Sequence, residues 1–187
     1  KPRRIVEIGS GGSTEILDAA CAMNAADGRP VDYAVYDPYA SDRVRSDDLA
    51  HARVAPLAAQ EVPQDAFTAL RSGDLLFIDS THTVKLGGDV NRLFLEILPL
   101  LAPGVLVHVH DIFLPREYPR SWIEQDGKFW AEQYLLQAFL CLNAEFEVVL
   151  PLNALLHDGA REAGEILRRQ GPDAYPGSFW FRRRELR

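Results

Sequence analysis

Short apolar runs alternate along the chain with segments whose apolar residues recur at helical spacing. The runs are nearly continuous in apolar character, which is typical of strands buried on both faces. We predict strands at residues 3–9, 31–37, 52–57, 74–80, 104–111, 146–151 and 177–184. We predict helices at residues 13–26, 63–73, 88–101 and 126–143, with further helical segments at 41–50 and around 160–169. This rhythm predicts a single doubly wound, Rossmann-like α/β domain with a mostly parallel sheet.

The composition is that of a globular protein, and its charge narrows the choice of partners. The 187 residues are 47% hydrophobic and carry a net charge of −7, so we expect no nucleic-acid partner. The basic run "FRRRELR" at 181–187 is a local exception, which we interpret as a solvated chain end. No run approaches the ~20 apolar residues of a membrane span, so we expect no membrane partner. The two isolated cysteines, Cys21 and Cys141, favour a reducing, cytoplasmic setting. Nothing in the pattern indicates an oligomeric state.

The stretch "IVEIGSGGST" at residues 5–14 places a glycine-rich turn directly after the first predicted strand. Ligands of open parallel sheets bind beyond the carboxyl ends of the strands, and glycine lets ligand atoms approach the backbone. A dinucleotide fingerprint would need a glycine where Thr14 stands. The carboxylate of Glu7 would also repel a pyrophosphate, whereas it favours a ligand that carries an amine or another positive charge.

Asp37 ends the second predicted strand, where a carboxylate can accept hydrogen bonds from both ribose hydroxyls. The alternative is that Asp37 caps the following turn, "DPYAS". An acid beside the glycine turn and a second acid placed for a ribose together suit a nucleoside with a cationic amino-acid tail. S-adenosylmethionine has this chemistry.

Several segments together resemble a class I S-adenosylmethionine-dependent methyltransferase, and more narrowly the bacterial methyltransferase-24-type domain. They are "VEIGSGGST", "YDP", "DLLFIDSTH", "LPLLAPGVLVHVHDIFLPREYP" and "FWAEQYLLQAFL", and the resemblance spans roughly residues 4–151. It implies a seven-stranded sheet with an antiparallel strand near one edge, and one methyltransferase domain over residues 1–187. Such domains usually have helices ahead of the first strand, so we expect that part of an upstream cap is missing here.

The resemblance also implies which residues bind the cofactor. Glu7, Gly9 and Gly11 would cradle its methionine part with Ser10 between them, and Asp37 would bind its ribose. Residues 55–57 would lie near the adenine. Asp79 would face the reacting end of the cofactor.

Acids and histidines gather at the ends of two predicted strands: Asp79, His82, His108, His110 and Asp111. Strand alternation places His108 and His110 on the same side, and the two aspartates should approach one another at the carboxyl edge. Three interpretations remain open. The cluster is structural; or it binds a divalent metal such as Mg²⁺ or Mn²⁺ through Asp79, Asp111 and His110, with His82 as another candidate ligand; or His110 or His82 acts as a general base beside Asp111.

Residues 112–127 contain prolines among large aromatic side chains, including Pro115 and Pro119. Proline disrupts a helix interior, so we predict an irregular segment that covers the active site.

Methylation of a small-molecule hydroxyl is our leading hypothesis for the function, with a base or metal to activate the acceptor. An NAD-dependent oxidoreductase is a second hypothesis, which Thr14 and Glu7 weaken. A cofactor-binding module without catalytic activity is a third.

Overall fold

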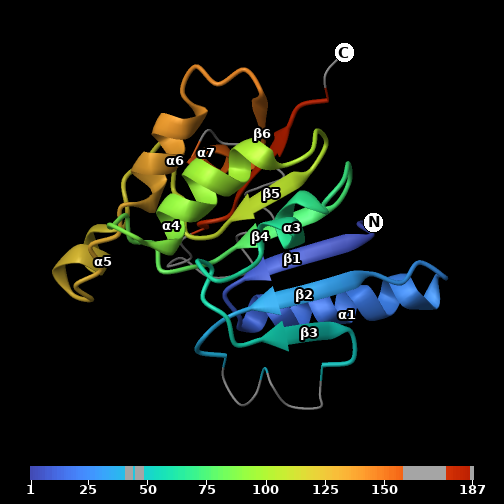
Figure 1. Ribbon diagram of the computed structural model, residues 1–187. Coiled ribbons are helices and arrows are strands. Elements are labelled where there is room, and N and C mark those ends of the chain that lie inside the picture. Colours follow the sequence, from blue (N-terminus) through green and yellow to red (C-terminus); the bar gives the residue numbers. More distant parts are fainter. Residues whose placement is uncertain (41–43, 45–48, 158–175, 186–187) are drawn as a thin grey trace.

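The computed structural model describes residues 1–40, 44, 49–157 and 176–185, and its centre is a seven-stranded sheet (Figure 1). The strand order is β3-β2-β1-β4-β5-β7-β6. The strands are β1 (Arg4–Ile8), β2 (Asp32–Tyr36), β3 (Ala52–Ala55), β4 (Leu75–Ile78), β5 (Leu106–Val109), β6 (Phe146–Pro151) and β7 (Phe179–Arg183). Strands β1 to β5 pair in parallel, while β7 runs antiparallel to both β5 and β6. The predicted mostly parallel sheet with an antiparallel strand near one edge is confirmed.

Helices cover both faces of this sheet (Figure 1). Helix α1 (Gly12–Ala26) packs on one face, and α3 (Gln64–Thr68), η1 (Arg92–Ile97) and α6 (Glu132–Leu140) contribute to the core on the other. The remaining helical elements are α4 (Asp89–Asn91), η2 (Leu98–Leu100), α5 (Arg120–Glu124) and α7 (Leu152–His157). The helices predicted at 41–50 and around 160–169 fall largely or wholly outside the described residues.

Two predicted helices differ in detail from the structure. The segment predicted at 88–101 passes from the α-helical α4 through the π-helical η1 into the 3-10 turn η2. The helix predicted at 126–143 is only Glu132–Leu140. It begins where the backbone amides of Ala131 and Glu132 donate to the carbonyl oxygen of His82, so a tertiary contact decides its start.

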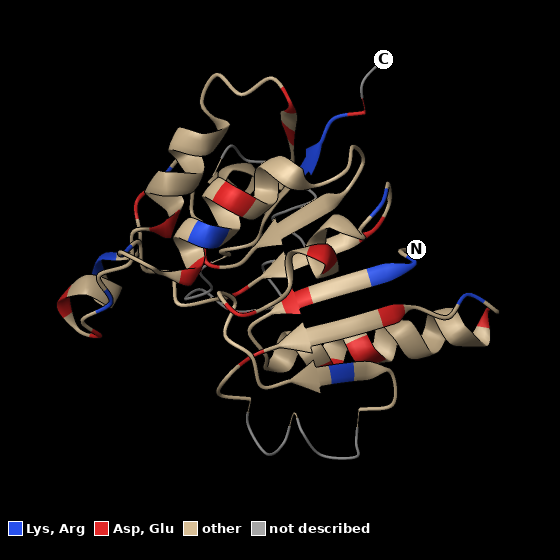
Figure 2. Ribbon diagram, viewed as in Figure 1, with Lys and Arg blue, Asp and Glu red and all other residues tan. Residues whose placement is uncertain are grey.

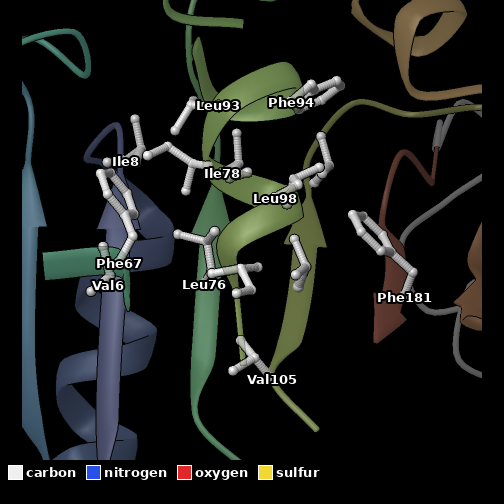
Figure 3. Close-up of a cluster of buried hydrophobic side chains, with 14 of the residues drawn as sticks. Val6, Ile8, Phe67, Leu76, Ile78, Leu93, Phe94, Leu98, Val105 and Phe181 are labelled. Carbon is white, nitrogen blue, oxygen red and sulfur yellow. The ribbon is translucent and has the colours of Figure 1, made fainter. Parts of the chain in front are cut away.

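The alternation of side chains along β1 explains why its sequence looks continuously apolar. Val6 and Ile8 point into the larger core cluster, while Ile5 belongs to a smaller cluster with Cys21 of α1 on the opposite face. Figure 3 shows the larger cluster between the sheet and the helix that carries Leu93 and Leu98. Because apolar cores cover both faces of the sheet, its carboxyl edge is where polar groups can meet a ligand.

The segment after β5 is mostly irregular, as predicted. No continuous helix runs from residue 114 to 120, and the Leu114–Pro115 peptide bond is cis. The exception is the short helix α5, which projects away from the sheet (Figure 1).

Charged residues near the end of the chain belong to a strand of the sheet and form ion pairs there. Figure 2 shows basic residues along β7, where Arg182 pairs with Glu147 and Arg183 pairs with Glu145. Phe181, directly before these arginines, is fully buried. The interpretation of this run as a solvated end is therefore wrong for residues 181–183, because they belong to an inner strand. Among the described residues, no helix has the length and apolar character needed to cross a membrane.

Candidate cofactor and acceptor site

A cavity of about 400 Å³ opens beyond the carboxyl ends of β1, β2 and β4. Four of the predicted cofactor-binding residues line it: Gly9, Ser10, Asp37 and Asp79. Further lining residues are Tyr36, Tyr39, Gln60, Thr81, Lys85 and Asp89. The cavity lies where open parallel sheets bind their ligands.

Gly9 allows two chain segments to meet at the base of this cavity. Its φ is +86°, and a Cβ atom at this position would lie 1.8 Å from the carbonyl oxygen of Asp79. The Gly9 amide donates to the carbonyl oxygen of Tyr36 at 2.9 Å, and the Asp79 amide donates to the carbonyl oxygen of Ile8 at 2.8 Å. A side chain at residue 9 would separate β1 from the loop after β4, so the first glycine of the turn is required by packing as well as by ligand access.

Asp37 connects the glycine turn to the end of β2. Its Oδ2 accepts hydrogen bonds from the backbone amide of Ser10, at 3.0 Å, and from the Ser10 hydroxyl. Its Oδ1 accepts from the amide of Tyr39 at 2.8 Å, so the turn-capping alternative is also present. Each carboxylate oxygen can accept more than one hydrogen bond, and a cap at Asp37 does not prevent contact with a ribose.

Glu7 and Gly11 are not among the residues that line the cavity. Glu7 is fully buried beneath the glycine turn, where it accepts hydrogen bonds from Ser13, at 2.6 Å, and from the Tyr33 hydroxyl. Burial raises the pKa of Glu7, although these hydrogen bonds oppose the shift. Gly11 precedes α1, and its amide donates to Thr14 Oγ1 at 3.0 Å. Both residues therefore support the turn, and their contact with the cofactor stays a prediction.

His82 lies between two carboxylates. Its Nε2 is 3.2 Å from Asp79 Oδ1, and its Nδ1 is 2.7 Å from Glu132 Oε2. Burial alone would lower the pKa of His82, but the hydrogen bonds to Asp79 and Glu132 outweigh burial and raise the pKa to about 10. A general base must be neutral before it takes a proton, so the structure favours His82 as a buried cation and not as the base.

Glu132 was not singled out by the sequence, although it lies within the block "FWAEQYLLQAFL". It is the first residue of α6 and is fully buried. Burial raises the pKa of Glu132, while the contact with His82 opposes that shift. Its second oxygen, Oε1, has no hydrogen-bond partner among the residues that the structure describes. In the sequence, the signal for Glu132 was an acid at the start of a segment with helical spacing. Its partner His82 is 50 residues away along the chain, so local spacing does not reveal the pair.

His108 and His110 lie on the same side of β5, as predicted, with His108 Nε2 3.2 Å from His110 Nδ1. His108 is buried against aromatic rings, with centroid distances of 4.1 Å to Phe77 and 4.5 Å to Trp180. Burial lowers the pKa of His108 to about 3, and the neighbouring His110 adds to this effect. His110 is partly exposed, and its Nε2 is 3.8 Å from Asp111 Oδ1. Neutral His108 can therefore orient His110 without competing for its proton.

Asp79 and Asp111 interact electrostatically at the edge of the sheet. Burial raises the pKa of Asp111 and the charge of Asp79 adds to the rise, while His110, His82 and Lys128 oppose it. Burial opposes the ionisation of Asp79, yet its hydrogen bond to His82 and the nearby histidine charges lower its pKa. His82 and Asp111 both have left-handed backbone conformations, with φ values of 56° and 57°. Such non-glycine conformations concentrate at functional sites.

The predicted metal set of Asp79, Asp111 and His110 is not supported by this geometry. Across residues 1–40, 44, 49–157 and 176–185, no group of three or more His, Cys, Asp or Glu side chains is arranged to hold a metal ion. Asp79 instead has His82 as its partner, which already supplies the positive charge that a metal would bring.

A family model described as a methyltransferase domain matches residues 6–112, which covers the glycine turn, the cavity and both histidine-bearing strand ends. The chain belongs to this methyltransferase family. It is an S-adenosylmethionine-dependent methyltransferase, as the resemblance of its motifs implied. No curated protein matches the chain.

Solved structures agree with the fold of this methyltransferase. A proposed methyltransferase from Thermobifida fusca is 16% identical, with a TM-score of 0.53 over 98% of this chain and 74% of the other. A 16S rRNA (adenine(1408)-N(1))-methyltransferase from Catenulisporales acidiphilia, solved as a mutant with its cosubstrate SAM, is 15% identical, with a TM-score of 0.39 over 99% and 87% of the two chains. The citrinin polyketide synthase CMeT domain is 13% identical, with a TM-score of 0.45 over 100% and 48%.

The prediction that excluded a nucleic-acid partner is contradicted by the rRNA methyltransferases among these similar structures. The physical reason is that net charge is a sum over the whole surface. A chain with a net charge of −7 can still carry local basic groups, and the local distribution is what a nucleic acid would contact.

Proposed function

We propose that this methyltransferase transfers the methyl group of S-adenosylmethionine to a hydroxyl oxygen of a small molecule. The observation that carries the proposal is the cavity at the carboxyl ends of β1, β2 and β4, which Asp37 and Asp79 both line. Asp37 would accept the ribose hydroxyls, and Asp79 would face the positively charged end of the cofactor. Gly9 and Ser10 would contact the cofactor through their backbone.

Catalysis in this proposal depends mainly on alignment, since the sulfonium already activates the methyl group. The acceptor oxygen forms a bond to the methyl carbon as the carbon–sulfur bond breaks, leaving S-adenosylhomocysteine. The hydroxyl proton must leave during this step, and in this proposal the imidazole of His110 would accept it. Its Nδ1 is held by His108, and its Nε2 lies near Asp111, which would stabilise the imidazolium that forms.

The segment after β5 would form the wall of the acceptor site. Trp130 lies with its ring centroid 4.1 Å from that of His82, and 5.2 Å from that of Trp122. Lys128 Nζ lies 4.2 Å from the centre of the Trp122 ring. These aromatic faces favour an acceptor with an apolar or ring-shaped body.

Calorimetric titration with S-adenosylhomocysteine tests the cofactor assignment. Asp37→Ala should weaken binding by ~2 kcal/mol or more, about 30-fold, because charge-assisted hydrogen bonds to the ribose are lost. Asp32→Ala is the matched control, since Asp32 lies at the other end of β2 and pairs with Arg4 and Arg53. Equal affinity of Asp37→Ala and the wild type would refute the site. Binding of NADH in place of S-adenosylhomocysteine would favour the oxidoreductase hypothesis.

A second assay tests the base and the acceptor. Formation of S-adenosylhomocysteine would be followed with a panel of phenols, sugars and polyketide alcohols, and with an RNA. His110→Ala should lower turnover ~100-fold or more while leaving affinity for S-adenosylhomocysteine unchanged. Methylation of RNA alone would overturn the small-molecule acceptor, and undiminished turnover in His110→Ala would overturn the base.

A further inference from the structure

We propose that Glu132 is a positioning residue that acts through His82 on Asp79 in the cofactor cavity. Glu132 is fully buried and does not line the cavity, whereas Asp79 does. The proposal rests on the proposed function in one respect, which is that this cavity takes S-adenosylmethionine.

The imidazole of His82 is the link between the two acids. A carboxylate lies within hydrogen-bond distance of each ring nitrogen, Glu132 at 2.7 Å and Asp79 at 3.2 Å. With both acids ionised, the two contacts are satisfied together when both ring nitrogens carry a hydrogen. The two acids then hold the ring in one orientation, and the ring donates to Asp79 from a fixed direction.

The backbone and an aromatic ring hold His82 from other sides. Its carbonyl oxygen accepts from the amides of Ala131, at 3.0 Å, and Glu132, at 3.2 Å. The ring of Trp130 lies against the imidazole. His82 keeps a left-handed backbone with φ of 56°, a conformation that persists in non-glycine residues only where surrounding contacts impose it. Glu132 therefore contacts His82 through both its side chain and its main chain.

The charges around His82 show why Glu132 matters for Asp79. The neighbouring groups are the acids Asp79, Asp111 and Glu132, and the base His110, with Asp89 close enough to Glu132 to affect it. Of these, only Glu132 is hydrogen-bonded to Nδ1. Without the charge of Glu132, the imidazole of His82 loses the interaction that fixes the orientation of the ring and keeps both ring nitrogens protonated. Asp79 then loses an oriented donor at the wall of the cavity, and cofactor affinity should fall.

A double-mutant cycle distinguishes this link from a general effect on folding. By calorimetry, Glu132→Gln should weaken binding of S-adenosylhomocysteine about tenfold, the effect of losing one charge-assisted hydrogen bond. Asp79→Asn should weaken it by at least as much. In the Asp79→Asn background, Glu132→Gln should cost less than about twofold more, because Asp79, the residue on which Glu132 acts, is already replaced by a neutral side chain. Glu132→Asp, which keeps the charge, should retain most of the affinity.

Gln133→Leu is the matched control. Gln133 is the next residue of α6 and equally buried, but its side chain contacts Phe113 and Arg116 instead of His82. This variant should lower the melting temperature while leaving the affinity within about twofold of the wild type. Additive losses in the Glu132–Asp79 cycle, or an equal loss of affinity in Gln133→Leu, would overturn the proposal.

Two further measurements apply if Glu132→Gln does not fold or if the wild type does not bind S-adenosylhomocysteine. If Glu132→Gln does not fold, a cycle of His82→Gln with Asp79→Asn tests the same series of contacts at its central residue, His82. The same non-additivity is expected. If the wild type fails to bind S-adenosylhomocysteine, the proposed function fails, and the imidazole N–H signals of His82 in proton NMR still decide the positioning claim. The Nδ1 proton should be protected from exchange in the wild type and in Gln133→Leu. Its rapid exchange in the wild type would refute the link.

Discussion

His82 and His108 both lie close enough to Asp79 to affect its charge and are almost equally buried, with 6% and 3% of their surfaces exposed. Their protonation is nevertheless opposite. His82 follows β4 and lies between Asp79 and Glu132, and its pKa rises to about 10. His108 lies within β5 against Phe77 and Trp180, and its pKa falls to about 3. Burial favours the neutral form of both rings, so the adjacent carboxylates account for the difference.

This contrast divides the site into two halves with different tasks. On the β4 side, a charged imidazole is fixed between acids next to the cofactor cavity. On the β5 side, a neutral imidazole contacts His110, while Trp180 donates to Ser178 at 2.8 Å next to the same ring. A permanently charged ring suits the positioning of an acid, and a neutral ring suits the orientation of a base. The predictions below test this division.

The largest expected effect comes from removing the buried cation. His82→Leu should reduce the free energy of unfolding by ~3–5 kcal/mol, because Glu132 is left buried without a partner. Urea denaturation would measure the loss. Adding Glu132→Gln to His82→Leu should restore part of the stability, since the orphaned charge is removed. A double variant no more stable than His82→Leu would show that the penalty has another origin.

The pH dependence of stability should run in opposite directions for the two histidines. The folded pKa of His82 lies above the ordinary value of ~6.5, so its contribution is present in full below that value and is lost as pH rises through about 10. The folded pKa of His108 lies below the ordinary value, so its contribution is present above ~6.5 and is lost as pH falls toward about 3. Each change should amount to a few kcal/mol.

Histidine NMR titration would check these directions ring by ring. Between pH 5 and 8, neither buried ring should change its chemical shift by the amount that a full titration produces. A His82 signal that titrates near 6.5 would remove the contrast between the two sites.

The smallest expected effect is that of His108→Phe. A phenyl ring keeps the stacking on Phe77 and loses only the weak contacts to His110 and Ser178, at 3.2 and 3.5 Å. The free energy of unfolding should change by less than ~1.5 kcal/mol. Turnover should fall clearly although the free energy of unfolding changes little, because His110 loses its orienting partner. A stability loss as large as that of His82→Leu would contradict the comparison.

Local pattern was sufficient for most of the fold. The apolar runs located all seven strands, and the inner strands β1 and β4 are apolar along most of their length because they are buried on both faces. The parallel order placed Gly9, Asp37 and Asp79 at one edge of the sheet, where the cavity lies. Alternation along β5 placed His108 and His110 on the same side. The antiparallel β7, by contrast, was expected only through the family resemblance.

Where the pattern was insufficient, a distant contact decided the outcome. The helix predicted at 126–143 starts at Glu132, because that is where the backbone reaches the His82 carbonyl. The pattern predicted a strand at 177–184, but only the topology places β7 between β5 and β6. Residues predicted as one helix at 88–101 follow α, π and 3-10 geometry in turn, and their spacing alone does not distinguish these.

The sequence by itself determined the alternation of strands and helices, the glycine turn and the positions of the acids at strand ends, since each depends on neighbouring residues and on the period of the backbone. Only the tertiary structure decided which groups become partners. It turned Glu7 inward to Ser13 and Tyr33, and it brought Glu132 to His82 across 50 residues of chain. The charge of a buried side chain depends on the groups that fold against it, and periodicity carries no record of those groups.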